Sequence, residues 1–489
     1  RQALPEGLAA EQLDELPFDS ARKRLSALYR QNGDLVLHTK GALETVLPLC
    51  DSVMVQGVSQ PLTDEWRERF TTEENRLGTE GLRVLAVAHR RMADDASDPM
   101  QETGLHLTGL VALEDPPRPE VPAAIATCQA AGIRVIMVTG DHPHTALAIA
   151  RQIGLVRSAA PTVVTGDALR RMSDSHLLLL LDNPEILFAR LDPEQKTRLV
   201  AMLQRKGEVV AMTGDGVNDA PALKLADIGV AMGRSGTDVA RAAADMVLAD
   251  DNFASIVSAV EEGRAVYANV RKFLTYIITS NMPEIVPYLA FVLLRIPLPL
   301  TIIQILAVDL GTDMVPALGL GVEDAEPAIM QQPPRRRGER LLSGAVLLRA
   351  YGFLGVIEAT AAMAAYFFVL HRGGWQWGTM LAAGDPLYRQ ATTACLTAIV
   401  AMQIANVFVC RSSKESLFRT GFFGNRLILW GIATELVAIA FINHTAIGNI
   451  IFGTQPFSAE VWLLIIPCAL AMILLDEMRK LFLRAQKRG

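Results

Sequence analysis

Two acidic residues, Asp215 and Asp219, lie four positions apart in a glycine-flanked loop. The loop is part of Thr213-Gly-Asp-Gly-Val-Asn-Asp-Ala-Pro-Ala-Leu-Lys224, and the apolar run before it predicts a strand over Glu208–Met212. A strand of a parallel sheet presents polar groups at its carboxyl end. Two carboxylates this close repel each other unless a cation lies between them. Because magnesium prefers carboxylate and phosphate oxygens, the loop indicates phosphate chemistry with a bound magnesium ion.

Strand and helix patterns alternate around this loop, over residues 120–255. Arg134–Val138 is strand-like and ends in Thr139-Gly140-Asp141, and a helix is expected from about His144 to Ile153. The alternation predicts a doubly wound α/β domain with its function at the strand-end loops. A further Thr-Gly-Asp, at residues 165–167, lacks a following Asn-Asp pair, and we interpret it as a simple strand-to-helix turn.

Composition separates the chain into a charged part and an apolar part. The 489 residues are 51% hydrophobic, but residues 1–260 are mixed and charged, whereas residues 273–475 are dominated by long apolar runs. The net charge of −6 gives no reason to expect a nucleic acid as a partner. The five cysteines are scattered without a C-x-x-C pair, which argues against a disulfide framework or a thiolate metal site.

A proline-rich joint divides the charged part. The first 113 residues are typical of mixed α/β structure, with short strands at Leu35–Leu37 and Val84–Val87. Asp115-Pro-Pro-Arg-Pro119 follows, and such joints often separate domains. We therefore expect a domain boundary near residue 114.

Six apolar segments follow, and a spanning helix needs about 20 apolar residues. They cover residues 273–294, 301–322, 344–370, 391–410, 427–442 and 461–475, of which the last two are short. Three basic groups flank them: Arg335-Arg336-Arg337 with Arg340, then Arg411, Lys414 and Arg419, and finally Arg479, Lys480, Arg484, Lys487 and Arg488. The positive-inside rule places all three groups in the cytoplasm. This predicts a multi-pass protein of the plasma or inner membrane, with cytoplasmic soluble domains.

Polar residues interrupt the first two apolar segments. Asn281 and Glu284 share a helical face, and Pro283 between them leaves the carbonyl of Thr279 without its helical partner. Broken helices at membrane depth are typical of ion sites, because a freed carbonyl can coordinate a cation. The second segment carries three polar residues on one helical face: Asp309, Thr312 and Asp313.

Acids at this depth indicate a function. On insertion scales each costs about 2.5–3.5 kcal/mol, so Glu284, Asp309 and Asp313 need a compensating positive charge, which a transported cation or protons would provide. Later segments add further polar candidates: Gln403, Asn406 and Glu435. For Gln403 and Asn406, a hydrogen bond between helices is an equally good interpretation. Glu358 is also deep, and the sequence suggests no role for it.

These motifs, in this order, resemble those of type II P-type cation-transporting ATPases, the group of calcium, sodium/potassium and proton/potassium pumps. The resemblance covers essentially the whole chain. Its most specific elements are Thr213–Lys224, Asp115-Pro-Pro-Arg118, Met137-Val-Thr-Gly-Asp141, Lys40-Gly-Ala42 and Asp309-Leu-Gly-Thr-Asp313.

The resemblance implies three domains. Residues 1–113 would be the C-terminal part of an α+β nucleotide-binding domain. Residues 114–257 would form a haloacid-dehalogenase-like (Rossmann-type) α/β phosphorylation domain. Residues 258–489 would form a stalk and an α-helical transmembrane bundle of six spans.

Roles at the phosphorylation site follow from the same resemblance. Asp215 resembles the magnesium-ligating acid, with Asn218 and Asp219 as its neighbours. Thr139-Gly140-Asp141 resembles the loop that positions the transferred phosphoryl group, and Lys196 the lysine that neutralises phosphoryl charge. Phosphoryl transfer needs these parts: positioning, a metal and a fixed positive charge.

An ATP pocket is also implied, so that ATP and Mg²⁺ are the expected cofactors. Phe18 would stack on adenine, with Lys23, Lys40, Gly41 and Arg83 around the nucleotide. Without the neighbouring Lys40-Gly-Ala42 motif, we would interpret Phe18 as a core residue, and Lys23 and Arg83 as solvated charges. Further ATP candidates are Arg190, Thr139, Gly140, Asp141, Lys196 and Asn218.

Two features depart from the family pattern. The family phosphorylates the Asp of a D-K-T-G-T motif, preceded by four spans and an actuator domain, and this chain contains no such motif. We therefore interpret the chain as a C-terminal fragment, inactive alone, whose partner is the N-terminal part of the same pump. The ion site is mixed: Pro283, Asp309 and Gln403 resemble sodium/potassium-type pumps, whereas Asn406 matches the calcium type. The transported cation is thus Na⁺, K⁺, Ca²⁺ or H⁺.

The expected function is ATP-driven cation transport through an aspartyl phosphate, with a helix over Ser258–Tyr276 as the mechanical link. Two alternatives stay open. A membrane-anchored phosphatase of the haloacid-dehalogenase type would explain Asp141 and Asp215 but not the intramembrane acids. A non-catalytic, nucleotide-binding membrane fragment would act in regulation.

Overall fold

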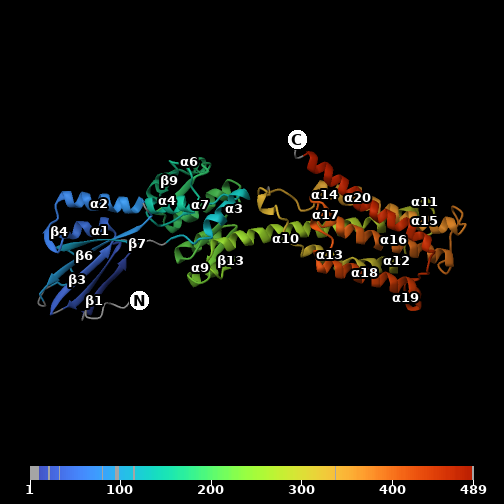
Figure 1. Ribbon diagram of the computed structural model, residues 1–489, viewed down its shortest axis with the longest axis horizontal. Coiled ribbons are helices and arrows are strands. Elements are labelled where there is room, and N and C mark those ends of the chain that lie inside the picture. The colour runs from blue at the N-terminus through green and yellow to red at the C-terminus, as the bar shows by residue number, and fades with distance from the viewer. Residues whose placement is uncertain are drawn as a thin grey trace. The chain divides into compact units, whose positions relative to one another are not determined.

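The computed structural model describes residues 10–19, 22–31, 33–79, 81–93, 98–113, 116–335 and 337–486. Asp115 of the proline-rich joint lies outside the described residues, as do Arg336, Lys487 and Arg488. The chain forms two compact units, one up to Val257 and one from Ser258 onward. Helix α10 (Phe253–Ser280) begins in the first unit and continues through the boundary, so the helix expected over Ser258–Tyr276 is present (Figure 1).

A seven-stranded sheet is the centre of the first part of the chain, and its order is β1-β2-β3-β6-β7-β4-β5 (Figure 1). Paired strands are antiparallel except for β4 and β7. Helices α1 and α2 pack against the sheet and close a core that includes Leu37, Leu43 and Leu105. The elements are β1 (Ala10–Asp19), β2 (Arg24–Gln31), β3 (Asp34–Gly41), α1 (Leu43–Val46), η1 (Leu47–Leu49), β4 (Cys50–Val55), β5 (Val58–Pro61), α2 (Asp64–Thr79), β6 (Arg83–Met92) and β7 (Leu105–Leu113).

Two parallel three-stranded sheets form the centre of the following domain, with the orders β8-β10-β9 and β11-β12-β13. The alternation of strands and helices is the architecture that the sequence predicts. The strands are β8 (Met137–Val138), β9 (Thr162–Thr165), β10 (Ile186–Ala189), β11 (Ala211–Gly214), β12 (Ile228–Met232) and β13 (Met246–Leu248). The helices are α3 (Val121–Ala130), α4 (Pro143–Gln152), α5 (Gly166–Arg171), α6 (Asp174–Leu180), α7 (Pro193–Arg205), η2 (Val217–Asp219), α8 (Ala220–Leu225) and α9 (Asp238–Ala243).

The edge strands β8 and β11 begin later than the sequence predicts. β8 begins at Met137 rather than Arg134, and β11 begins at Ala211 rather than Glu208. All residues of β10, the central strand of its sheet, are buried, whereas β11 is partly exposed and Val209 before it is 66% exposed. An edge strand has hydrogen-bond partners on one side only, so its ends are held less firmly than those of a central strand.

Within the described residues, six helical segments are long and apolar enough to cross a membrane: Phe253–Leu294, Ile302–Gly321, Gly344–Arg372, Pro386–Cys410, Arg426–His444 and Ala459–Gln486. All six expected spans are therefore present. The fifth and sixth are longer than their apolar segments, because polar and basic residues such as Arg426 and His444 continue the helices.

The elements of the membrane unit after α10 are α11 (Met282–Leu294), α12 (Ile302–Ala307), η3 (Val308–Thr312), α13 (Met314–Gly321), η4 (Ile329–Gln331), α14 (Gly344–Leu347), η5 (Leu348–Gly355), α15 (Val356–Arg372), α16 (Pro386–Cys410), α17 (Leu417–Thr420), α18 (Arg426–His444), α19 (Ala446–Phe452), η6 (Ala459–Val461) and α20 (Trp462–Gln486).

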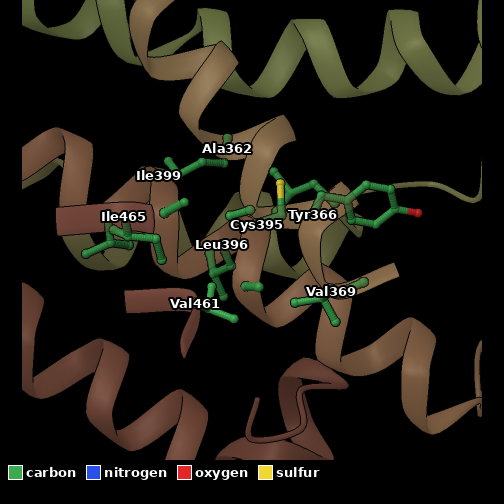
Figure 2. Packing of buried hydrophobic residues seen from close by; sticks show 14 of the residues in the cluster. Ala362, Tyr366, Val369, Cys395, Leu396, Ile399, Val461 and Ile465 are labelled. Carbon is green, nitrogen blue, oxygen red and sulfur yellow. The ribbon is translucent and has the colours of Figure 1, made fainter. Parts of the chain in front are cut away.

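Helices α15 and α16 pack closely at the centre of the membrane unit. Figure 2 shows residues from three segments in this contact: Ala362, Tyr366 and Val369 of α15, Cys395, Leu396 and Ile399 of α16, and Val461 and Ile465 of the last span. The alanine lets the two backbones approach, as small residues do between membrane helices. The side-chain hydroxyl of Tyr366 has a hydrogen-bond partner inside this core, because it donates to the Pro297 carbonyl at 2.8 Å.

Three histidines form a row across one face of the seven-stranded sheet. His38, His89 and His106 lie opposite one another on β3, β6 and β7, with neighbouring ring centroids 6.3 Å and 5.6 Å apart. Burial lowers the pKa of His38, and burial, with His106 and His38 beside it, lowers the pKa of His89. The folded sheet therefore disfavours protonation of His38 and His89.

We expect this sheet to lose stability as the pH falls below about 6.5, the usual histidine pKa. A lowered pKa in the folded state means that the unfolded chain binds protons more readily, so stability is unaffected above that value and declines as the pH falls toward the folded pKa. Thermal unfolding at about pH 7.5 and about pH 5.5 measures the loss. The double variant His38→Gln, His89→Gln should lose less, whereas the exposed control His176→Gln should match the parent. Equal losses in all three proteins would contradict the prediction.

Candidate functional site

The acidic loop follows edge strand β11 directly. Asp219 is 7% exposed, and its Oδ2 accepts a hydrogen bond of 3.2 Å from the Gly216 N–H. Lys196 Nζ lies 2.7 Å from Asp219 Oδ1. Asp215, in contrast, is exposed, and its backbone carbonyl accepts a hydrogen bond of 2.8 Å from the Thr237 N–H. The loop therefore fixes one carboxylate and leaves the other open to solvent.

Helix α7 positions Lys196. The Asp192 carboxylate accepts a hydrogen bond of 2.9 Å from the Gln195 N–H, and the Gln195 side chain accepts one of 3.1 Å from the Asp192 N–H. This capping box, with Pro193 in the first turn, fixes where the helix begins. The partial positive charge of a helix N-terminus favours nearby anions. Lys196 and the start of α7 thus give this region fixed positive charge.

The Thr139-Gly140-Asp141 loop follows the other edge strand, β8. The Thr139 N–H donates to the Phe188 carbonyl at 2.9 Å, and the Arg190 N–H donates to the Asp141 carbonyl at 3.1 Å. Within the loop, the Thr139 hydroxyl donates to Asp141 Oδ2 at 3.1 Å. Backbone hydrogen bonds to strand β10 and the residues after it therefore hold the loop in place, while Gly140 and Asp141 are exposed.

The chemistry of Asp215 and Asp219 fits a magnesium ion that binds together with phosphate. Within the described residues, no group of three or more His, Cys, Asp or Glu side chains could hold a metal ion by itself. Magnesium is usually bound by one or two carboxylates, with waters and substrate phosphate completing its coordination. Two carboxylates from one loop meet that need. Asn218, also exposed, lies between them in sequence.

Five of the candidate ATP residues lie at one end of the seven-stranded sheet: Phe18, Lys23, Lys40, Gly41 and Arg83. Lys23 lies in the turn between β1 and β2, Gly41 ends β3 and Arg83 begins β6, and antiparallel pairing brings these ends together. Phe18 and Lys40 lie one residue before the ends of their strands. The Phe18 side chain is exposed, so it is free to stack on a planar ring.

Gly41 is required by the close approach of β2 and β3. A Cβ at this position would lie 2.5 Å from Arg24 Cβ and 2.6 Å from the carbonyl oxygen of Lys23. Any other residue would push the strands apart, because real Cβ contacts are longer. The glycine of the Lys40-Gly-Ala42 motif thus has a packing role as well as its expected place in the pocket.

Glu44, which the sequence analysis missed, connects two of the ATP candidates. Its Oε1 lies 3.4 Å from Lys23 Nζ and 3.4 Å from Arg190 Nη2. All three side chains are largely exposed, and exposed pairs of this kind are worth little in stability. The signal that could have found Glu44 is its position, four residues after Lys40 and just beyond the Lys40-Gly-Ala42 motif.

In the membrane unit, Asp313 is the centre of a hydrogen-bonded group. The Tyr276 hydroxyl donates to Asp313 Oδ1 at 2.9 Å, and Ser280 Oγ lies 3.5 Å from the same atom. All three side chains are buried. The sequence analysis missed Tyr276 and Ser280 as site residues. Their spacing is the signal that could have found them, because residues 276, 280 and 284 share one helical face.

Both helices that carry the acids are broken beside them. α10 ends at Ser280 and α11 begins at Met282, so Asn281 lies at the break that Pro283 predicts. In the second span, η3 is a π-helical turn that contains Asp309. Such turns are frequent at functional sites.

Several polar atoms near these breaks have no partner within the described part of the chain. They are Glu284 Oε1, Gln403 Nε2, Asn406 Nδ2 and both carboxyl oxygens of Glu435. Thr312 Oγ1 donates to Gln403 Oε1 at 3.2 Å, and Asn406 Oδ1 accepts from the Cys410 thiol at 3.2 Å. The first bond joins two spans, whereas the second lies within α16, and each accounts for one end of an amide. Because buried polar atoms are nearly always paired, the remaining atoms point to a ligand.

Glu284 and Asp309 interact with each other at an open side of the membrane unit. Asp309 is exposed. Glu284 lines a groove of about 380 Å³ together with Tyr288 and Ile305. Both acids therefore lie on an open face of the membrane unit with mostly apolar neighbours.

Comparison with known proteins assigns the three regions separately. Residues 8–120 match the cytoplasmic domain N of P-type ATPases, and residues 196–260 match haloacid dehalogenase-like hydrolases. Residues 297–482 match the C-terminus of cation transporting ATPases. A haloacid-dehalogenase-like α/β domain followed by six membrane helices defines a P-type transport protein.

Curated relatives match almost the whole chain. The chain is 38% identical to sodium/potassium-transporting ATPase subunit alpha-3 of Gallus gallus and 37% identical to that of Homo sapiens, over 97% of this chain and 53% of each relative. It is 38% identical to human subunit alpha-4 over 97% of this chain and 52% of the relative. The chain belongs to the type II P-type cation ATPases. It spans about half the length of the curated relatives it matches.

We expect Gly214→Ala to destabilise the acidic loop. A Cβ at this position would lie 2.4 Å from Asp219 Cβ and 2.8 Å from its Cγ, so Asp219 must move away from Lys196. Overpacking of this kind costs about 1–3 kcal/mol, measurable by thermal unfolding. Gly140→Ala is the matched control, because a Cβ there meets nothing within 4 Å. Equal unfolding temperatures for the two variants would show that the loop absorbs the extra atom.

Proposed function

We propose that the full-length protein is an ATP-driven cation pump that works through an aspartyl-phosphate intermediate. This chain would contribute the ATP and magnesium sites and much of the cation site. The observation that carries the proposal is the buried group around Asp313, in the same chain as a phosphoryl-transfer loop. A membrane-anchored phosphatase needs no acids at membrane depth, where each is costly.

At the phosphorylation loop, this chain would act through positioning and charge. Thr139, Gly140 and Asp141 would bind the transferred phosphoryl group, and Lys196 would neutralise its charge. Asp215 and Asp219 would hold magnesium, which supplies further neutralisation of phosphate charge when bound. Lys196 contacts Asp219 in the structure, so it is already beside the position where the phosphoryl group would arrive.

The open edges of β8 and β11 support a nucleophile from a segment outside this chain. Each of these edge strands belongs to a parallel sheet, and each leads into one of the two phosphate-binding loops. One added parallel strand could pair with both edges and present an aspartate between the loops. We infer that the N-terminal part of the pump provides this strand. A further span from that part would cover Glu284 and Asp309.

We propose Na⁺ or K⁺ as the transported cation. The relatives are named sodium/potassium-transporting ATPases, and Pro283, Asp309 and Gln403 resemble that branch. The residues proposed to surround the cations are Asn281, Glu284, Asp309, Thr312, Asp313, Gln403, Asn406 and Glu435. Helix α10 continues from the first unit to Ser280, so it would transmit movement between the two sites.

Asp313→Asn should abolish cation-stimulated ATP hydrolysis in the full-length protein, because it removes the charge at the centre of the proposed cation site. Hydrolysis measured across a panel of Na⁺, K⁺, Ca²⁺ and H⁺ concentrations checks this expectation and identifies the ion. Asp324→Asn makes the same chemical change at an exposed position and should leave stimulation intact. If no cation stimulates the parent protein, or if Asp313→Asn is stimulated normally, the transport proposal is wrong. Cation-independent hydrolysis of simple phosphate esters would favour a phosphatase.

Lys196→Met should lower the rate of phosphoenzyme formation from ATP by about 10²-fold or more, since one preorganised charge aimed at the transferred group is worth this much. Incorporation of labelled phosphate into the full-length protein measures the rate. Lys206→Met, near the end of the same helix and paired with Asp182, is the matched control and should form phosphoenzyme normally. A similar rate in both variants would show that Lys196 does not stabilise the transferred phosphoryl group.

A further inference from the structure

Glu358 is a buried acid that the proposed cation site does not use. It lies in the first turn of α15 and is 0% exposed. Both of its carboxyl oxygens are buried and lack a hydrogen-bond partner within the described residues. Its helix neighbours Leu354 and Ala361 belong to an apolar cluster. The surroundings thus provide neither donors nor charge for an ionised carboxylate.

A second buried acid in the same unit has the basic partners that Glu358 lacks. Asp476 on α20 is also 0% exposed, but Arg349 lies 3.4 Å away, Arg479 2.7 Å and Lys480 3.0 Å. These basic residues are therefore already engaged. On the other elements packed against α15, Arg389 donates to the Ala383 carbonyl, and Glu460 beside η6 pairs with Arg372 of α15 itself.

Packing places Glu358 near the proposed cation site. Leu354 and Ala361, one turn on either side of Glu358, belong to the same buried cluster as Tyr276, which donates to Asp313. Cys410 of α16 belongs to that cluster too, and Glu284 is the acid carried by α11. Among these facing groups there is no basic residue. The charge that would stabilise Glu358 must come from outside the described chain.

A proton fits Glu358 better than a metal ion does. A metal ion needs several oxygen ligands, and no group of three acidic, histidine or cysteine side chains surrounds this position within the described residues. A proton needs one carboxyl group and removes the charge completely. A cation arriving beside Asp313 adds positive charge nearby, which favours release of that proton, and by linkage the two occupancies affect each other equally.

We propose that Glu358 is a proton-binding residue that releases its proton when a cation occupies the Asp313 site. The inference rests on the proposed transport function. In the step, the Glu358 O–H bond breaks, the proton passes to water, and the carboxylate keeps the electron pair. For a monovalent cation, one positive charge enters the region as one leaves. When the cation departs, Glu358 takes up a proton again.

Proton release from the full-length protein in detergent tests the proposal. In weak buffer near neutral pH, saturating Na⁺ or K⁺ chloride should release about one proton fewer from Glu358→Gln than from the parent, read with a pH indicator. Glutamine has the shape of the protonated acid, so the variant should fold. Glu460→Gln, the same change at an exposed position, should release as many protons as the parent. Equal release from Glu358→Gln and the parent would overturn the proposal.

Infrared spectroscopy gives a second readout that does not require turnover. The parent without cations should have a protonated-carboxyl carbonyl band that Glu358→Gln lacks and that weakens when the cation is added. If the band is missing, or if it is unaffected by a cation that stimulates ATP hydrolysis, Glu358 does not exchange a proton, whether or not the protein is a pump. If the band responds to the cation but no cation stimulates hydrolysis, the transport proposal is wrong, whereas the proton-binding role of Glu358 is supported.

Discussion

Carboxylates that need positive charge form the centre of both candidate sites. At the candidate phosphorylation loop, Lys196 supplies that charge to Asp219, and Asp215 is exposed to solvent. In the membrane unit, Asp313 is buried, and the described residues give it two neutral donors, Tyr276 and Ser280. A buried charge without a charged partner is strongly unfavourable, so Asp313 requires a cation or a proton.

Regular structure holds these charges, and local irregularities make them usable. The loops at the phosphorylation site follow short edge strands, and the cation candidates lie at the break after Ser280 and in the π-helical turn η3. A regular helix would use its carbonyls internally, whereas a broken one leaves some for a ligand. Away from these breaks, the ion pair between Arg349 and Asp476 joins η5 to α20.

Local patterns were sufficient to predict several features of this protein. The six spans, the alternating α/β domain and the break at Pro283 all follow from runs of residues near one another in sequence. The strands at 134–138 and 208–212 were predicted to begin three residues too early, because their hydrogen-bond partners could not be known. Glu44 was missed for a similar reason, since its partner Arg190 lies 146 residues away.

The sequence by itself determined which chemistry is available: acids beside glycines in a strand-end loop, acids in membrane spans, and motifs typical of one ATPase family. Only the tertiary structure decided which of those acids are compensated. Asp476 and Glu358 are both buried acids in apolar helices, yet Asp476 lies among three basic residues, whereas the described residues give Glu358 no partner. Two of those bases, Arg479 and Lys480, follow Asp476 by three and four positions on the same helix, which spacing alone predicts. The third, Arg349, is 127 residues away in the chain, and its approach, like the isolation of Glu358, depends on distances of a few ångströms between helices that spacing within one helix does not give.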